Sequence, residues 1–306
     1  MSIVFRTVHQ VRFSHCDPGG IVYFPHFFDF INATIEDWSD EALEAPFETR
    51  LLQRRLGMPV VMAQCEFFRP CHIGDRLEME LAIARLGRST IDFQVSGKVG
   101  GEQRLRARQV IAMVSLENYR PVPIPEALLE KVAPYVLGAA PLPRIATDGA
   151  APPKVFQSRH QLRFSHCDPA GILYSPNTFD MINAAVEDWF GEALGLSFAE
   201  MHIRQRLGFP IVDTHCEFLK PSRIGEQLTL QLSIARLGRS SLVLRISGIV
   251  AGEERMRARH VVAMISLETL RAVPIPPELR AKMAAYAVEV ADPAQQSAVP
   301  AAARDG

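Results

Sequence analysis

The sequence repeats itself once, at a constant distance of 151 residues. The segment His9 to Pro18, HQVRFSHCDP, returns as HQLRFSHCDP from His160 to Pro169, an offset of 160 − 9 = 151. The same offset relates the Pro-Ile-Pro of residues 123–125 to that of residues 274–276, and no gap is needed between them. Repeats of solenoid proteins span about 20 to 50 residues, so this long period indicates two copies of one domain. A chain of 306 residues is long enough for each copy to bury its own core.

The composition between and after the copies predicts the domain boundaries. We expect the first domain over residues 1–137 and the second over residues 155–290. Residues 138–154 are rich in Ala, Pro and Gly and have no apolar period, which is typical of a linker. Residues 291–306 have a similar composition, and we expect a disordered tail there.

Hydrophobic spacing within a copy predicts one helix followed by several strands. A strand-like stretch at residues 8–13 and an Asp-Pro-Gly-Gly turn precede apolar residues at helical spacing, including Phe27, Ile31 and Trp38, with Pro25 placed to open the helix. Strand candidates with glycine at their turns follow, and a short helix near residues 125–136 ends the copy. This order predicts an α+β fold in which a curved antiparallel sheet wraps the central helix. The strand candidates span about 58–69, 76–86, 89–99 and 104–117.

The bulk composition argues against several classes of partner. Lys and Arg number 33 against 34 Asp and Glu, a formal net charge of −1, so no overall field attracts nucleic acid or an anionic membrane. No apolar run approaches the roughly 20 residues that a membrane-spanning helix needs. The N-terminal residues do not resemble a secretory signal, so we expect a cytoplasmic protein. The five cysteines form no C-x-x-C pair, which favours free thiols over structural zinc.

The run FSHCDPGGIVYFP, from Phe13 to Pro25, resembles the signature of the 4-hydroxybenzoyl-CoA thioesterase family of hotdog proteins. The second copy, FSHCDPAGILYSPN from Phe164 to Asn177, is more similar still. The likeness extends over residues 5–137 and 156–288. It implies a double hotdog, each half a long central helix wrapped by a curved antiparallel sheet. Because such domains pair with active sites at the subunit interface, it also implies an intrachain pseudo-dimer that can assemble into a larger homo-oligomer.

The resemblance implies that the motif aspartates, Asp17 and Asp168, are the catalytic carboxylates. It also implies that a backbone N–H at the start of the central helix polarises the thioester carbonyl. Helix-start N–H groups lack partners within the helix and lie at the positive end of its dipole, which suits a developing oxyanion. The aspartate could attack the carbonyl carbon or activate water, and the sequence does not separate these routes. The N–H donors would be those of Tyr23 and Phe24 in the first copy, and of Tyr174 and Ser175 in the second.

Two departures from the family pattern leave the equivalence of the copies open. His15 and His166 stand where the family often has an acidic residue, two positions before the aspartate. His26 in the first copy is replaced by Asn177 in the second. An aspartate followed by proline and glycine can also simply initiate a turn, which is the alternative to a catalytic role.

Coenzyme A carries a pyrophosphate and a 3′-phosphate, which favour arginine as the binding residue. Arginines lie at a predicted glycine turn between two strands, and the resemblance implies a nucleotide contact for the arginine before each Pro-Ile-Pro segment. The alternating arginines rank lower, since arginines on a solvated strand face need no ligand; they are Arg104, Arg106 and Arg108, with Arg255, Arg257 and Arg259 in the second copy. The candidates are Arg85, Arg88, Ser89 and Arg120, and in the second copy Arg236, Arg239, Ser240 and Arg271.

The predicted function is hydrolysis of an acyl-CoA, with an aromatic hydroxybenzoyl-like or a short acyl group, to the free acid and CoA. Coenzyme A enters as part of the substrate, so no cofactor and no metal are expected. One alternative is a hotdog enoyl-CoA hydratase or dehydratase, which would need an Asp and a His converging on the substrate. Another is a non-catalytic acyl-CoA binding module. Glu36 and Asp37, on the predicted helix, are alternative acids for which a solvated or capping role is favoured.

Overall fold

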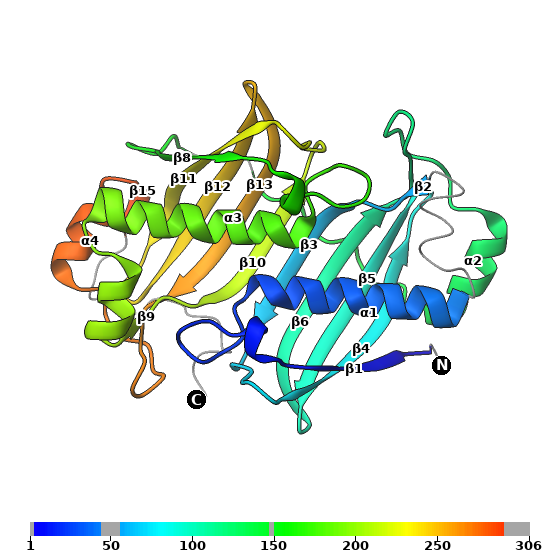
Figure 1. Cartoon of the computed structure of the whole chain (residues 1–306), viewed down its shortest axis with the longest axis horizontal. Helices are drawn as coiled ribbons and strands as arrows, with labels where there is room; N and C mark the ends of the chain where they lie inside the picture. Colours follow the sequence, from blue (N-terminus) through cyan, green and yellow to red (C-terminus); the bar gives the residue numbers. More distant parts are fainter. Residues whose placement is uncertain (1–2, 44–55, 147–149, 291–306) are drawn as a thin grey trace. The chain divides into compact units, whose positions relative to one another are not determined.

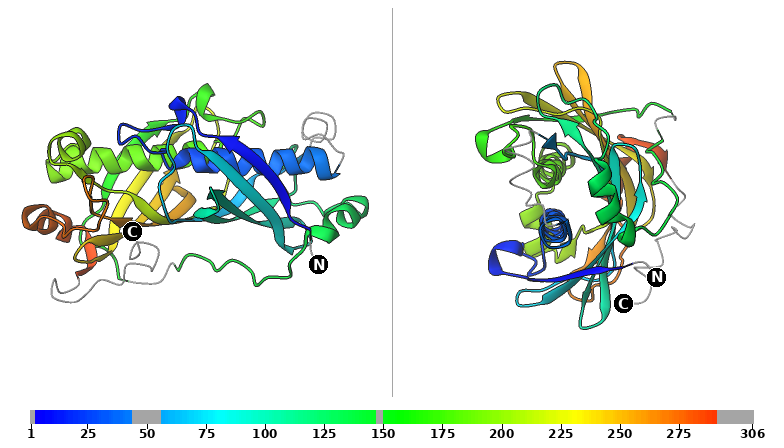
Figure 2. Two further views of the ribbon diagram at one scale, coloured as in Figure 1. Left: turned by 90° about the horizontal axis from the view of Figure 1, so that it is seen from below. Right: turned by 90° about the vertical axis from the view of Figure 1, so that its right-hand side faces the viewer.

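The computed structural model of the chain describes residues 3–43, 56–146 and 150–290, and it divides into two compact units, Met1–Arg144 and Ile145–Gly306. Within each unit one long helix, α1 or α3, lies across the face of an antiparallel sheet that curves around it (Figures 1 and 2). The predicted α+β class, with a sheet wrapping a central helix in each half, is confirmed.

In the first unit the strands are all antiparallel and follow the order β1-β4-β5-β6-β3. They are β1 (Phe5–Gln10), β4 (Arg76–Leu86), β5 (Thr90–Val99), β6 (Glu102–Ala112) and β3 (Val60–Phe67). A separate short pair joins β2 (Leu56–Gly57) to β7 (Val114–Ser115). The helical elements are η1 (Phe13–His15), α1 (Pro25–Leu43), α2 (Glu126–Val132) and η3 (Ala133–Tyr135).

The second unit repeats this order as β10-β13-β12-β11, and both β8 and β15 pair with β11 at the edge. The strands are β10 (Ile211–Phe218), β13 (Glu253–Ala263), β12 (Ser241–Val250), β11 (Gln227–Leu237), β8 (Phe156–Gln161) and β15 (Ala287–Val290). A short pair joins β9 (Leu207–Gly208) to β14 (Ile265–Ser266). The helical elements are η4 (Phe164–His166), α3 (Ser175–Asp188), η5 (Trp189–Leu194), η6 (Glu200–Arg204) and α4 (Pro277–Ala284).

The strand predicted at residues 8–13 was partly wrong. Strand β1 ends at Gln10, and Phe13 to His15 form a 3-10 turn closed by the His15 N–H, which donates to the Arg12 carbonyl at 3.0 Å. The fourth strand was drawn too long, because β6 ends at Ala112 and Val114–Ser115 form a separate strand that pairs with β2. The predicted tail at residues 291–306 lies outside the described residues.

The predicted linker has no helix or strand where the structure describes it, and two of its residues are hydrogen-bonded, each within its own unit. In the first unit the Arg108 guanidinium donates to the Ala140 carbonyl at 3.1 Å. In the second unit the Ile145 N–H donates to the Glu217 carboxylate at 2.6 Å. A linker with these contacts is more restrained than its Ala, Pro and Gly content alone indicates.

The core of each unit lies between its central helix and its sheet. In α1 the side chains of Phe28, Ile31 and Trp38 are buried, and the Trp38 ring meets Phe93 of β5 edge-on at 5.2 Å between centroids. Phe179 and Trp189 repeat the buried ring positions in the second unit. Each fully buried large apolar side chain contributes about 1.5 to 3 kcal/mol, so this stripe holds the helix against the sheet.

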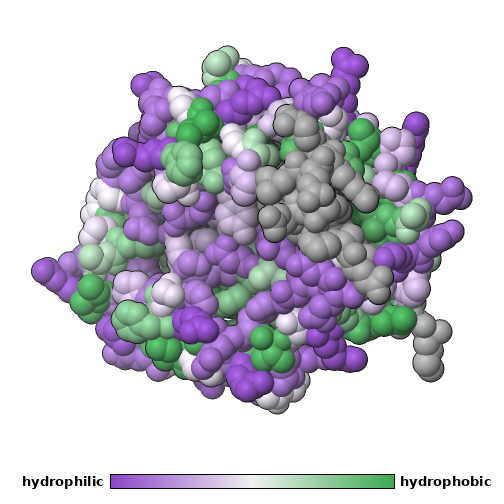
Figure 3. Space-filling model, turned by 45° about the vertical axis from the view of Figure 1, so that its right-hand side comes forward, coloured by the Kyte–Doolittle hydropathy of each residue, from purple (hydrophilic) through white to green (hydrophobic). Residues whose placement is uncertain are grey.

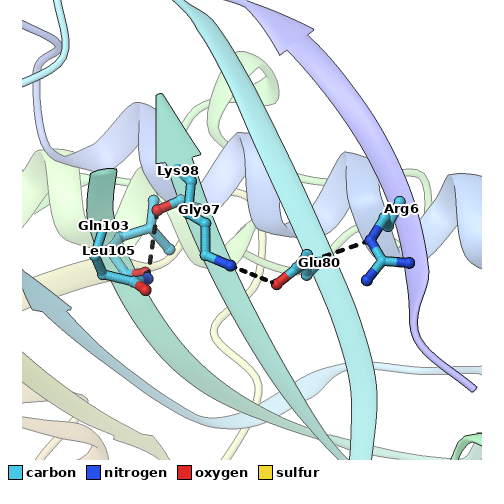
Figure 4. A network of polar contacts seen from close by, with 6 residues as sticks. All are labelled: Arg6, Glu80, Gly97, Lys98, Gln103 and Leu105. Atoms are coloured by element: carbon cyan, nitrogen blue, oxygen red, sulfur yellow. Dashed lines mark hydrogen bonds and ion pairs between the residues drawn. The ribbon is translucent and has the colours of Figure 1, made fainter. Parts of the chain in front are cut away.

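Cross-strand ion pairs lie along the edge strands of the first sheet. Glu80 of β4 accepts from Lys98 of β5 at 3.0 Å and from Arg6 of β1 at 3.1 Å (Figure 4). The Lys98 contact, and more weakly the Arg6 contact, hold the pKa of Glu80 below its usual value against the opposing effect of burial.

Hydrophilic side chains also cover much of the face drawn in Figure 3, with hydrophobic ones in small groups between them.

One equivalent arginine in each unit, on β6 or β13, pairs with a carboxylate, and the strand that carries this carboxylate differs between the two units. Arg108 of β6 binds Asp92 of β5 through two nitrogens, one of them Nε at 2.8 Å. The equivalent Arg259 of β13 instead binds Asp213 of β10 at 3.0 Å. In the second unit Val243 occupies the position of Asp92. In the first unit Met62 occupies the position of Asp213. Each unit therefore supplies one carboxylate to this arginine, from opposite sides.

We expect Asp92→Val to lower the melting temperature, because it leaves Arg108 poorly exposed and unpaired, at a cost of about 3 kcal/mol. Adding Met62→Asp should recover most of that loss, since it recreates the arrangement of the second unit. Thermal unfolding of both variants, and of Met62→Asp alone, is the measurement. Equal melting temperatures for the single and double variants would show that the two arrangements are not interchangeable.

A polar position between helix and sheet also differs between the units. In the first, Gln109 of β6 donates to Asn32 of α1 at 2.8 Å. In the second, the buried His260 takes the place of Gln109 and, with Asn183 of α3, lines a cavity of about 10 Å³. That volume is roughly enough for one water molecule. Burial lowers the pKa of His260 to about 3, so its imidazole is neutral at neutral pH.

The buried His260 makes the stability of the chain fall at acid pH. Unfolding raises the pKa from about 3 to an ordinary value of about 6.5, so between these pH values the unfolded chain binds more protons. Stability is therefore complete above about pH 6.5 and decreases as the pH falls towards 3. We expect His260→Gln to reduce this decrease in thermal melts, whereas the exposed-site control His72→Gln should not change it.

Candidate active site

The motif aspartate of the first unit lies in a tight turn between η1 and α1. The Asp17 N–H donates to the Ile21 carbonyl and the Gly20 N–H to the Asp17 carbonyl, both at 2.9 Å. The carboxylate Oδ1 accepts from the Gly19 N–H at 2.8 Å. Gly20 has φ of +77°, a region that side chains disfavour, so the Asp-Pro-Gly-Gly sequence suits this turn. The half-buried carboxylate is fixed to its own loop by backbone contacts.

The second unit builds the same turn, and backbone N–H groups again donate to its carboxylate. Asp168 Oδ1 accepts from the Ala170 N–H at 2.9 Å and from the Ile172 N–H at 3.3 Å. Burial raises the pKa of Asp168, and the backbone donors around it, led by Ile172, oppose that rise. A carboxylate with a raised pKa is a better proton acceptor than an ordinary aspartate.

The motif loop is tied to the helix start by one backbone hydrogen bond in each unit. The Tyr23 N–H donates to the His15 carbonyl at 2.9 Å, and the Tyr174 N–H donates to the His166 carbonyl at 3.0 Å. These two N–H groups therefore donate to the loop in this structure, which leaves Phe24 before α1 and Ser175, the first residue of α3, as the preferred candidates for the oxyanion donor.

A second set of contacts places the motif loop at one end of the sheet. The Val22 N–H donates to the Cys71 carbonyl at 2.9 Å, just beyond the end of β3. In the second unit the Leu173 N–H donates to the Ser222 carbonyl at 2.8 Å, just beyond β10. The aspartate turn, the helix start and the end of this strand thus form one hydrogen-bonded cluster in each unit.

The predicted CoA-binding arginines gather at another end of each unit. The Ile124 N–H donates to the Arg88 carbonyl at 2.9 Å and the Met113 N–H to the Ser89 carbonyl at 2.7 Å, which joins the glycine turn to the segment containing Arg120. The second unit repeats both contacts at 2.9 Å and 2.8 Å. The arginine side chains of both sets are exposed, and Ser89 and Ser240 are half-buried. The exposed arginines are Arg85, Arg88 and Arg120, with Arg236, Arg239 and Arg271 in the second unit.

The motif aspartate and the arginine turn of one unit do not lie together. The Ala112 N–H donates to the Pro59 carbonyl, which places the arginine turn beside the start of β3, whereas Asp17 lies near its end. Strand β3 has eight residues, which at the usual rise corresponds to about 26 Å. The structure brings the arginine candidates together with one another, but not with the aspartate of the same unit.

The lower-ranked arginines on β6 and β13 hold acidic partners within the sheet. Arg106 Nε donates to Glu66 at 2.8 Å, and Arg257 pairs with Glu254 at 2.5 Å. One of the higher-ranked candidates is engaged as well, because Arg236 lies 3.4 Å from Glu289. The turn arginines Arg88 and Arg239 therefore remain the stronger candidates for binding phosphate.

The carboxylates on the central helices take a structural part. Thr7 of β1 donates to Asp37 at 3.2 Å, and Ser158 of β8 donates to Asp188 at 2.7 Å, so these acids fasten the edge strand to the helix. Glu36 is exposed.

Among the described residues no cluster of three or more His, Cys, Asp or Glu has the arrangement of a metal site. No helix in the described part of the chain is long and apolar enough to span a membrane.

The sequence did not predict the contacts of one position in the first turn of the central helix. His26 Nδ1 lies 3.1 Å from Asp29 Oδ2 in the first unit. The equivalent Asn177 donates to the carbonyls of His166 and Ser165, at 3.1 Å and 3.4 Å. The difference between the copies at this position was visible in the sequence, but its consequence for the loop needs the coordinates.

Known thioesterases match about 40% of the chain. The 4-hydroxybenzoyl-CoA thioesterase of a Pseudomonas species is 31% identical over 127 residues, 39% of this chain and 89% of its own. The 1,4-dihydroxy-2-naphthoyl-CoA hydrolase of a Synechocystis species is 28% identical over 125 residues, 40% of this chain and 89% of its own. A structure from Lactobacillus plantarum assigned as an oleoyl thioesterase covers 86% of this chain and 96% of its own, with a TM-score of 0.71 and 17% identity, and shares the fold.

A helix wrapped by a sheet in each half, with the aspartate turn at the helix start, defines a double-hotdog thioester hydrolase. The family model of the Thioesterase-like superfamily matches residues 11–132 and again residues 162–283. The chain belongs to this superfamily, as a tandem duplication within one polypeptide.

Proposed function

We propose that the chain hydrolyses an acyl-CoA to the free acid and CoA, with Asp17 and Asp168 as the catalytic carboxylates. The observation that carries the proposal is the position of the aspartate turn, hydrogen-bonded to the start of the central helix in both units. This arrangement combines a carboxylate with N–H groups at the positive end of a helix dipole. A thioester needs little more, because its thiolate is a good leaving group.

The carboxylate can act by either of two routes. As a nucleophile, a carboxylate oxygen attacks the carbonyl carbon, the CoA thiolate leaves, and water hydrolyses the resulting anhydride. As a general base, it takes a proton from a water whose oxygen attacks the same carbon. In both routes negative charge develops on the carbonyl oxygen, where the Phe24 or Ser175 N–H would stabilise it. One such donor is typically worth about 10²- to 10³-fold in rate.

The acyl group that we propose is aromatic and hydroxylated, or else short. Two relatives support this substrate class, since their names give 4-hydroxybenzoyl-CoA and 1,4-dihydroxy-2-naphthoyl-CoA as the molecules they act on. The identities of 31% and 28% are moderate, so a panel of acyl groups is the direct way to rank substrates.

We further propose that Arg88 and Arg239 bind the phosphates of coenzyme A. Both are exposed on the glycine turn after a long strand, and both turns are fixed by hydrogen bonds to the segment carrying Arg120 or Arg271. A guanidinium forms two parallel hydrogen bonds to a phosphate, and a fixed turn lowers the entropy lost on binding.

We expect Asp17→Asn combined with Asp168→Asn to lower kcat by about 10²- to 10⁴-fold, because the amide neither attacks carbon nor accepts the proton. Thiol release from benzoyl-, hydroxybenzoyl-, dihydroxynaphthoyl- and acetyl-CoA is the measurement. The matched control is Glu36→Gln with Glu187→Gln, which removes the exposed helix acids and should leave kcat unchanged. Loss of activity in this control, with the aspartate variant active, would assign catalysis to the helix.

We expect Arg88→Ala with Arg239→Ala to raise KM for CoA thioesters about tenfold and to leave kcat nearly unchanged, because a phosphate contact binds substrate and transition state alike. A pantetheine thioester, which lacks the nucleotide, should show no such change. Arg106→Ala serves as the control, since this arginine is paired with Glu66. A KM rise of equal size with both substrates would argue against a phosphate contact.

A further inference from the structure

The two units hold their aspartate loops against the central helix by different side chains. In the second unit, Asn177 in the first turn of α3 donates through Nδ2 to the His166 carbonyl at 3.1 Å and towards the Ser165 carbonyl at 3.4 Å. The His166 carbonyl also accepts the Tyr174 N–H at 3.0 Å. Two donors from the helix start thus converge on the residue two positions before Asp168.

In the first unit the equivalent side chain faces a different partner. His26 Nδ1 is 3.1 Å from Asp29 Oδ2, one turn further along the same helix. Its ring lies against His15 and Tyr23, with centroids 5.5 Å and 5.9 Å apart. The loop is packed against this imidazole, but only the Tyr23 N–H donates to the His15 carbonyl in the hydrogen bonds described.

The backbone of the two loops is nearly the same, so the difference lies in the side chain. Arg12 has φ −105° and ψ 165°, against −102° and 168° for Arg163. Cys16 has φ −101° and ψ 143°, against −106° and 150° for Cys167. In both loops the backbone N–H of the arginine donates to the ring Nδ1 of the motif histidine, at 3.0 Å and 3.1 Å. An asparagine at position 26 would therefore find the same carbonyls within reach.

We propose that Asn177 is a positioning residue that fixes the Asp168 loop on the start of α3, and that the second half consequently turns over faster than the first. The inference rests on the proposed function, because it assumes that the aspartate and the helix-start N–H act on one carbonyl. Reaction then requires both groups to hold their positions within a fraction of an ångström. The hydrogen bonds of Asn177 restrict the loop more than packing of the His26 ring does. They are directional, and they join the aspartate loop directly to the start of the helix.

The two halves can be measured separately in the full chain. Asp17→Asn leaves only the second carboxylate, and Asp168→Asn leaves only the first. We expect the Asp17→Asn chain to have a kcat about five- to tenfold above that of the Asp168→Asn chain on the same substrate, with KM values within about twofold.

Reciprocal substitutions then test the role of the Asn177 hydrogen bonds. In the Asp17→Asn chain, Asn177→His should lower kcat about five- to tenfold, to the level of the first half. In the Asp168→Asn chain, His26→Asn should raise kcat by a similar factor. A gain of activity cannot come from misfolding, and melting temperatures measured in parallel report any general loss of structure. If this side chain had only a structural role, its substitution would change the melting temperature. The kcat/KM of one half relative to that of the other would stay unchanged.

The outcomes separate this inference from the proposed function. Equal kcat in the two single-aspartate chains, with a double variant that is inactive, would overturn the inference and keep the catalytic assignment. A kcat unmoved by either His26→Asn or Asn177→His would do the same. A double variant with full activity would overturn the catalytic assignment itself, and this inference with it.

Discussion

The candidate active site of each unit depends on the hydrogen bond that joins the start of the central helix to the carbonyl two positions before the aspartate. It joins Tyr23 to His15 in the first unit and Tyr174 to His166 in the second. Without it, the turn that carries the carboxylate and the helix that supplies the positive end of a dipole would be separate elements. The helix in turn keeps its place because its apolar stripe is buried in the curved sheet.

Much of this architecture could be predicted from the sequence, because the features concerned are local. The 151-residue repeat, the helix opened by Pro25 and the strands between glycine turns depend on spacing and turn chemistry, which the sequence displays directly. The motif run also identified the family. The strand predicted through Phe13 failed because residues 13–15 close a 3-10 turn on Arg12, a contact that apolar alternation does not reveal.

The partners of polar side chains could not be predicted, since they come from elements distant in the chain. The four candidate oxyanion donors are equivalent in sequence, and only the coordinates show that Tyr23 and Tyr174 are already donating to the loop. The separation of the arginine turn from the aspartate of its own unit likewise follows from strand register. The differences between the copies gave a usable signal, since His26 and Asn177 proved to make different contacts.

The exchange of carboxylates around Arg108 and Arg259 restricts how the two repeats can recombine. A crossover between the positions of β3 and β5 that joins Met62 to the second copy's Val243 leaves the arginine with no acid, and the reciprocal product gives it both. One hybrid leaves the exposed Arg259 without its acid and the other places a second carboxylate beside Arg108, so each product of gene conversion across this segment has an unbalanced charge at this position. The halves can then diverge independently, as their central helices already have.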